Sequence, residues 1–223
     1  MLPNRVHRRL ILSDYGIPIY KAGSRQALLA ALADCIEGHE SLRQTAGLLH
    51  RDISIGNLMV GEDNRGFLID LDLAIHEQRV SASGAKGKTG TRAFMAIGAL
   101  LGEQHSFMHD LESFFWVLFW ICIHCDGPGD GKVMAQFDKW NYADTEELAK
   151  LKLGTVSDVD IFRKTTEESF TKYYRPLAPW VNTLRKAVFP GGRRWKREDS
   201  GLYAQMRDTL EEARKDPKVV AEA

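Results

Sequence analysis

The 223-residue chain has three cysteines, no net charge and no apolar run long enough for a membrane helix. An odd number of cysteines argues against a disulfide framework. Because 30 basic and 30 acidic residues cancel, the composition does not point to nucleic acid as a partner. The apolar run at 114–125 is shorter than the roughly 20 residues that span a bilayer, so no membrane association is expected. The N-terminal stretch also lacks a signal-peptide pattern, and we expect an intracellular protein, cytoplasmic or nuclear and not secreted.

Two of the cysteines, Cys122 and Cys125, have a spacing at which thiolates can share a zinc ion. No second pair of ligands with a suitable spacing occurs elsewhere in the sequence. Both cysteines also lie in the most apolar stretch of the chain, which favours a buried structural role over a metal site.

The apolar pattern predicts a mainly α protein of the α+β class. Apolar residues recur at helical spacing from Ser24, a good N-cap, to about Gln44. Residues 110–125 are apolar on all faces after the first turn, which is typical of a buried central helix. Residues 58–60 and 67–69 have strand propensity and are joined by turn formers, so they predict a hairpin. Further helices are expected at 146–151, 161–174, 179–188 and 201–215, after a break at 127–131.

A group of polar residues surrounds this hairpin. Asp52 follows His50 and Arg51, Asn57 comes five residues later, and Asp70 comes just after the second predicted strand. Pairing of the two strands would bring Asn57 beside Asp70. A carboxylate that accepts a hydroxyl proton, together with amide and carboxylate oxygens suited to Mg²⁺, predicts a phosphoryl-transfer site. Asp72 is a weaker candidate, because acidic residues at strand ends often only cap a turn.

Four motifs, in this order, resemble the catalytic domain of eukaryotic-type protein kinases, and more narrowly the fungal-type protein kinase family. Residues 49–57 are similar to the catalytic loop and residues 69–74 to the metal-binding motif. Residues 89–96 resemble the substrate-side end of the activation segment, and residues 109–115 the start of the central helix. The resemblance covers roughly residues 5–190 and implies a protein-kinase-like large lobe with its small hairpin at the catalytic site.

The resemblance implies a role for each residue near the hairpin. Asp52 would be the catalytic base, with Arg51 and Asn57 as its catalytic neighbours. Asn57 and Asp70 would hold Mg²⁺, and Asp70 and Met59 would contact ATP, Met59 from beneath the adenine ring.

The resemblance also implies anchors and a regulatory segment. His50 and Asp110 would be structural anchors, with Asp110 holding the backbone of the catalytic loop. Arg51 would pair with a phosphorylated activation segment. That segment contains four hydroxyl residues: Ser81, Ser83, Thr89 and Thr91.

Three positions depart from the wider kinase pattern. Ser54 stands where most serine/threonine kinases have a lysine, although the fungal-type family also tends to have serine there. Asp72 replaces a glycine of the metal-binding motif, which removes freedom to adopt unusual backbone angles. Gly98 replaces a glutamate that anchors the lobe through an ion pair, so we expect that anchor to be lost.

A kinase of this kind also has a small β-rich lobe with a glycine-rich loop and a lysine, which the residues before His50 do not supply. We expect one domain over residues 1–223, with 1–16 a remnant of the small lobe and hinge, 17–190 the large lobe, and 191–223 a basic loop and C-terminal helix. Phosphoryl transfer should be impaired in the chain as written. The open apolar surface should lower solubility or be covered by a partner.

Three functions therefore stay open. The first is a serine/threonine protein kinase that uses ATP and Mg²⁺ on protein substrates. The second is a pseudokinase or interaction module that keeps the large lobe. The third is a small-molecule phosphotransferase, which the stretch at 89–96 disfavours because such enzymes lack that segment. The basic cluster at 191–197, which includes a tryptophan, could bind an acidic partner or act as a nuclear address, but basic runs beside glycines are most often solvated loops.

Overall fold

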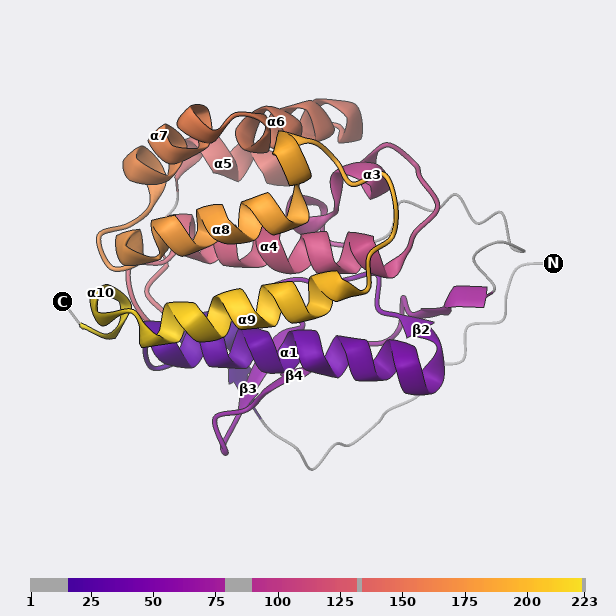
Figure 1. The fold of residues 1–223 in the computed structure, drawn as a ribbon, viewed down its shortest axis with the longest axis horizontal. Coiled ribbons are helices and arrows are strands. Elements are labelled where there is room, and N and C mark those ends of the chain that lie inside the picture. The colour runs from indigo at the N-terminus through magenta and orange to yellow at the C-terminus, as the bar shows by residue number, and fades with distance from the viewer. Residues whose placement is uncertain (1–15, 79–89, 132–133, 222–223) are drawn as a thin grey trace.

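Helix α4 (Phe107–His124) lies at the centre of the protein, and every one of its residues is buried. The computed structural model describes residues 16–78, 90–131 and 134–221. Helices α1 (Arg25–Ala46), α9 (Gly201–Lys215) and α8 (Ala178–Val188) run beside one another, and α8 packs on α4 (Figure 1). The central helix is therefore a fixed support for the segments attached to its first turn.

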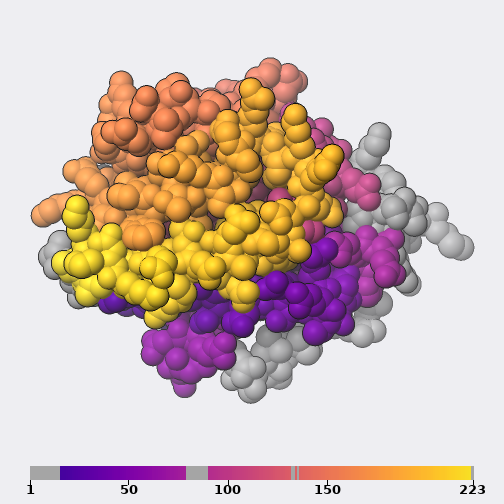
Figure 2. Space-filling view, viewed as in Figure 1, coloured from indigo at the N-terminus to yellow at the C-terminus, as the bar shows by residue number. Residues whose placement is uncertain are grey.

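The other described helices are short or lie around this centre. In Figure 1, α5, α6 and α7 lie on the far side of α4 from α1. The space-filling view shows α8 and α9 covering one face, with the turn of the hairpin protruding below α1 (Figure 2). The bounds are α3 (Ile97–Leu100), α5 (Ala135–Asp138), α6 (Thr145–Ser157), α7 (Val159–Ser169) and α10 (Pro217–Val220).

Two small antiparallel sheets lie against this helical body. The first has the order β1-β3-β4, with β1 (Gly16–Pro18), β3 (Leu58–Gly61) and β4 (Gly66–Leu68). The second pairs β2 (Leu48–Leu49) with β5 (Ile75–His76). Together they frame the loop 49–57 and the stretch 69–74, the two regions to which the sequence assigned the chemistry.

Strand β4 lies directly on helix α1, at a position where only glycine fits. A Cβ atom on Gly66 would come within 1.9 Å of the carbonyl oxygen of Ala31. The backbone N–H of Gly66 also donates to Oδ2 of Asp34 at 2.9 Å. Helix α1 therefore fixes the position of the hairpin.

The predicted mainly α fold is confirmed, and several helix ends follow local signals. Helix α1 begins after Ser24, whose hydroxyl accepts from the N–H of Ala27, and ends at Gly47 with a φ of 63°. Helix α9 has the predicted bounds. Among the described residues, no helix is long and apolar enough to cross a membrane.

The predicted helix at 161–174 is confirmed over residues 161–169, but its predicted C-terminal end is wrong, because α7 ends at Ser169. The reason lies in the central helix. The N–H of Thr171 donates to the carbonyl of Cys122 at 3.0 Å, and its hydroxyl donates to the carbonyl of Cys125 at 2.7 Å. Thr171 thus satisfies two acceptors at the C-terminal end of α4, and this takes the chain out of helical geometry.

Cys122 lies in α4, and Cys125 directly follows the end of this helix. Cys122 and Cys125 are buried free thiols. Burial raises the pKa of Cys122 well above its ordinary value and the pKa of Cys125 to about 11. In residues 16–78, 90–131 and 134–221, no three His, Cys, Asp or Glu side chains are grouped as a metal would require.

Candidate functional site

The hairpin brings two of the predicted site residues together. Leu58 pairs with Leu68, and the N–H of Ile69 donates to the carbonyl of Asn57 at 3.0 Å. Asn57 therefore lies just before the start of β3, directly across from Ile69 and next to Asp70. This arrangement places an amide side chain and an exposed carboxylate at the same end of the hairpin.

Asp52 lies at the same place, and both oxygens of its carboxylate accept hydrogen bonds. Oδ2 accepts from Nδ2 of Asn57 at 3.2 Å, and Nδ2 also donates to the carbonyl of Asp52 at 2.9 Å. Oδ1 accepts from the backbone N–H of Thr91 at 2.8 Å and from the Thr91 hydroxyl at 3.0 Å. The half-buried carboxylate is thus held from two sides.

Gly90 allows this approach of Thr91 to Asp52. Its φ is 111°, a conformation that side chains disfavour, and a Cβ atom there would lie 2.8 Å from the carbonyl oxygen of Arg51. The segment 90–97, named here the substrate-side segment, can therefore lie directly on the loop 49–57. A larger residue at position 90 would push the two apart.

Unusual backbone angles gather around the same residues. Among the described part of the chain, three non-glycine residues have a positive φ: Arg51 at 69°, Asn64 at 62° and Asp70 at 63°. Asn64 lies in the hairpin turn, where such angles are common. Arg51 and Asp70 flank the candidate site, and strained residues of this kind cluster at functional sites.

Asp110 in the first turn of α4 holds the loop in this strained shape. Its carboxylate accepts from the backbone N–H of His50 at 3.0 Å and from that of Arg51 at 3.1 Å. It also accepts from Nε2 of His39 and from Nε2 of His105, each at 2.8 Å. Burial alone would raise the pKa of Asp110, but His105 and His39 hold it well below its ordinary value.

His50 connects the loop to the stretch that carries Asp70. Its Nε2 donates to the carbonyl of Ile69 at 3.0 Å, and its Nδ1 accepts from the N–H of Asp52 at 3.3 Å. A carbonyl oxygen can only accept, so the ring carries its proton on Nε2. Burial lowers the pKa of His50, which favours this neutral form.

The structure describes Met59 and Asp72 among the remaining predicted residues. Met59 is half-buried in β3, on the strand face opposite Leu58 and Val60. Asp72 does not have a positive φ; its N–H donates to Oδ1 of Asp70 at 3.2 Å, so it needs no glycine-like freedom. Ser81, Ser83 and Thr89 lie outside the described residues.

Gly98 cannot form the anchoring ion pair of other kinases, but a different ion pair lies beside it. Arg194 pairs with Glu103, which follows α3, and a Cβ atom on Gly98 would lie 2.4 Å from Oε2 of Glu103. The same Cβ would lie 2.5 Å from Nε2 of His109. The ion pair between Arg194 and Glu103 therefore links the segment after α3 to the C-terminal loop, at a position next to Gly98. Because Trp195 also packs on His109, the basic cluster is more than a solvated loop.

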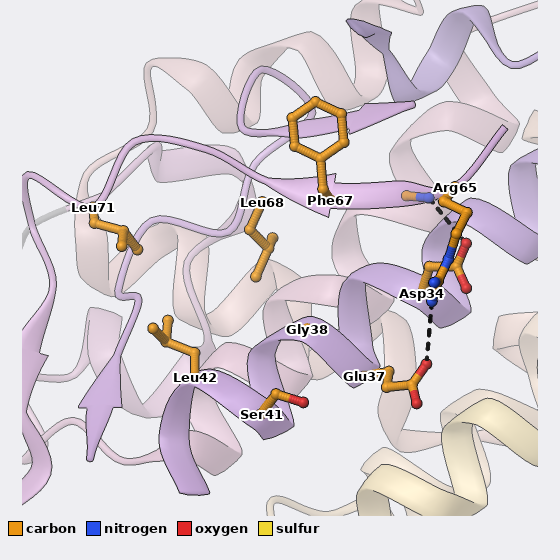
Figure 3. Close-up of a pocket in the computed structure, with 10 residues that line it drawn as sticks. Asp34, Glu37, Gly38, Ser41, Leu42, Arg65, Phe67, Leu68 and Leu71 are labelled. Atoms are coloured by element: carbon orange, nitrogen blue, oxygen red, sulfur yellow. Dashed lines mark hydrogen bonds and ion pairs between the residues drawn. The ribbon is translucent and has the colours of Figure 1, made fainter. Parts of the chain in front are cut away.

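A groove of about 450 Å³ runs beside the site, between α1 and β4 (Figure 3). Leu42, Leu68 and Leu71 line one end, and Asp34, Glu37 and Arg65 line the other. Leu71 lies between Asp70 and Asp72 and is 46% exposed. We expect an open apolar surface of this kind to be covered by a partner or to lower solubility, and both expectations stay predictions.

The oxygen donors at the hairpin suit a magnesium ion. Both hydrogen bonds from the Asn57 side chain use its amide nitrogen, so Oδ1 is the atom suited to a cation. Asp70 adds an exposed carboxylate at the same end. Mg²⁺ is usually held by one or two such groups together with phosphates and water, not by a complete cage of protein ligands.

Comparison with known proteins gives the family. The family model described as fungal protein kinase matches residues 2–122, more than half of the chain. The chain belongs to the fungal protein kinase family. Its members are protein kinases, which are transferases.

A curated relative supports this assignment. Over 77 residues, the chain is 38% identical to a protein of Encephalitozoon cuniculi named as a probable casein kinase I homolog. The match covers 32% of this chain and 24% of that relative. The chain spans about a quarter of the length of this curated relative.

Several residues that hold the site could not be recognised from the sequence. His39 lies on the buried face of α1, and a polar residue on such a face is itself a signal of a buried partner. His105 and Glu112 gave no signal before their partners were known. Lys152 was equally hidden, because a lysine between two leucines on a helix normally lies in solvent.

Proposed function

We propose that this member of the fungal protein kinase family transfers the γ-phosphoryl group of ATP to serine or threonine hydroxyls of protein substrates. The observation that carries the proposal is the contact between Asp52 and Thr91. It shows an aliphatic hydroxyl at hydrogen-bonding distance from a half-buried carboxylate that is held on its other oxygen by Asn57.

Asp52 is the proposed base of this reaction. The substrate hydroxyl oxygen would attack the γ-phosphorus, the bond from that phosphorus to the ADP oxygen would break, and the hydroxyl proton would pass to the Asp52 carboxylate. Thr91 would orient Oδ1, and Asn57 would orient Oδ2. Because both contacts fix the carboxylate before substrate arrives, little reorganisation is needed during transfer.

The other residues would bind nucleotide and metal. Asn57, through Oδ1, and Asp70 would hold Mg²⁺, which supplies positive charge to the phosphates when it is bound. Met59 would contact the adenine ring from β3. The half-burial of Met59 and its position on the strand face away from Leu58 support this assignment.

The proposal is tested by incubating the purified chain with γ-labelled ATP, Mg²⁺ and a mixed library of serine and threonine peptides. The Asp52→Asn variant keeps the shape of the side chain but lacks the base, and we expect a loss of about 10²–10⁴-fold in labelling. The Asp63→Asn variant, altered in the hairpin turn, is the matched control and should retain the activity.

Equal labelling by Asp52→Asn and by the unaltered chain would contradict the assigned base. A complete lack of labelling by the unaltered chain, under conditions where it is folded, would favour the alternative of a pseudokinase or interaction module. Transfer to small hydroxyl compounds but not to peptides would instead favour a small-molecule phosphotransferase.

A further inference from the structure

A buried acid and a buried base hold the turn at Met95–Ile97, inside the substrate-side segment. Nζ of Lys152, from α6, donates to the carbonyl of Met95 at 2.6 Å. Oε1 of Glu112, from α4, accepts from the N–H of Ile97 at 2.7 Å. The two charged side chains thus satisfy a carbonyl and an N–H two residues apart.

These backbone groups lack the partners that such a turn usually has. Ile97 is the first residue of α3, and the preceding Ala96 offers no side-chain cap. Met95, Ala96 and Ile97 are all buried, so water does not serve as the alternative partner. The turn therefore depends on Glu112 and Lys152.

The pair is fully enclosed by protein. Lys152 is 0% exposed and Glu112 is 1% exposed. Nζ of Lys152 lies 4.6 Å from the centre of the Trp116 ring and 5.4 Å from that of Trp140. The indole N–H of Trp116 also donates to Oε1 of Glu112 at 3.0 Å, so one tryptophan contacts both charged groups.

Burying two charges is costly. Burial lowers the pKa of Lys152 well below its ordinary value and raises the pKa of Glu112, while the charge of each partner opposes the effect on the other. Apolar residues of similar volume often replace such a pair without loss of stability. General stability alone therefore does not account for this pair, and a role in positioning does.

The turn is connected to the candidate site through a short rigid stretch. The 3-10 helix Arg92–Phe94 joins Thr91 to Met95, with the N–H of Phe94 donating to the Thr91 carbonyl and that of Met95 to the Arg92 carbonyl. Thr91 in turn donates twice to Asp52. A shift of Met95 would therefore move Thr91 relative to the proposed base.

Helix α4 holds both halves of the site from one turn. Asp110 binds the backbone of His50 and Arg51, and Glu112, two residues later, binds the backbone of Ile97. The same turn of α4 thus holds both the loop that carries Asp52 and the segment that carries Thr91.

We infer that Glu112 and Lys152 are positioning residues that act as a pair: they bracket the turn Met95–Ile97 and so fix Thr91 against Asp52. The inference rests on the proposed function for its catalytic meaning. The contact between Thr91 and Asp52 can nevertheless be measured without activity, because the Thr91 amide is one of its donors.

The test uses amide hydrogen exchange, measured by NMR, in the double variant Glu112→Gln/Lys152→Met. Lys152→Met alone leaves the buried carboxylate of Glu112 without its counter-charge, so it should lower the melting temperature more than the double variant does. The double variant should recover much of that loss. In the folded double variant, we expect the Thr91 amide to exchange about tenfold faster or more, while the amides of α9 are unchanged.

The matched control is Glu146→Gln/Lys150→Met, which removes an exposed ion pair from the same helix α6. Its Thr91 exchange should equal that of the unaltered chain. Trp116→Phe is a second variant, which loses the indole N–H to Glu112 and part of the ring beside Lys152, and it should accelerate exchange at Ile97 and Thr91 in the same direction.

Unchanged Thr91 exchange in the folded double variant would overturn the inference, and would make the pair part of the core only. If the double variant does not fold, unchanged exchange in Trp116→Phe overturns it equally. Failure of every chain, including the unaltered one, to phosphorylate peptides would count against the proposed function but would not alter this exchange result.

Discussion

Replacing Asp110 with asparagine should break the support of the candidate site. The aspartate carboxylate accepts from four donors: the amides of His50 and Arg51 and the rings of His39 and His105. Asparagine has one acceptor oxygen and turns its NH₂ group toward the other donors. Two buried donors therefore lose their acceptor, at about 1.5 kcal/mol each, and we expect a loss of about 3 kcal/mol in the free energy of unfolding.

Urea unfolding at pH 7, followed by circular dichroism, measures this loss. Asp208→Asn makes the same chemical change at an exposed position of α9 and should alter the free energy of unfolding by less than about 0.5 kcal/mol. Amide exchange at His50 and Arg51 should accelerate in Asp110→Asn only. A loss below about 1 kcal/mol, with these two amides still protected, would refute the view of Asp110 as the main anchor.

Three further predictions follow from burial and close contacts. Burial, and then the charge of His105, lowers the pKa of His109 from 6.5 to about 4 in the folded chain. On acidification, the unfolded chain therefore takes up this proton at a higher pH than the folded chain does. Stability should be complete above pH 6.5 and fall on acidification toward pH 4, by about 2 kcal/mol at pH 5 in urea titrations. Gly66→Ala should cost about 3 kcal/mol or more, because its Cβ would lie 1.9 Å from a carbonyl oxygen of α1. Gly90→Ala should accelerate amide exchange at Thr91 and weaken peptide phosphorylation, because the added Cβ meets the backbone of the loop 49–57.

Each of the three has a control in the same chain. His109→Gln keeps a capping residue at the start of α4 and should reduce the dependence on pH; an undiminished dependence would contradict the assignment. Gly38→Ala, with open space around its Cβ, should stabilise α1 by about 0.5–1 kcal/mol, and a similar loss in both glycine variants would count against the close contact at Gly66. Gly102→Ala shares a positive φ but touches nothing within 4 Å, so it should leave Thr91 unaffected.

The sequence was most informative where local chemistry decides the structure. Ser24 begins α1 through the predicted capping contact, and the turn formers at 61–66 correctly place the hairpin between residues 58 and 68. The spacing of Asp52, Asn57 and Asp70 led to the region that the hairpin assembles. These features depend on neighbours in the chain, and a single sequence contains that information.

Contacts between segments that are distant in the chain could not be predicted from the sequence. Thr171 ends α7 because it caps α4, and Glu103 takes the place beside Arg194 that Gly98 leaves open. The partners of Lys152 lie in α4 and in the substrate-side segment. In each of these cases, the residue acquires its role only when the tertiary fold places a remote partner beside it.

The most direct test of the account is a calorimetric titration of the chain with ATP and Mg²⁺. We predict binding that is lost in Asp70→Asn and retained in Asp72→Asn, because Asp70, unlike Asp72, directly follows Ile69, the residue that pairs with Asn57. Equal binding by the unaltered chain and Asp70→Asn would contradict the assigned metal and nucleotide site. An absence of binding at millimolar ATP, in a chain that circular dichroism shows to be folded, would contradict the account of this chain as a nucleotide-dependent kinase.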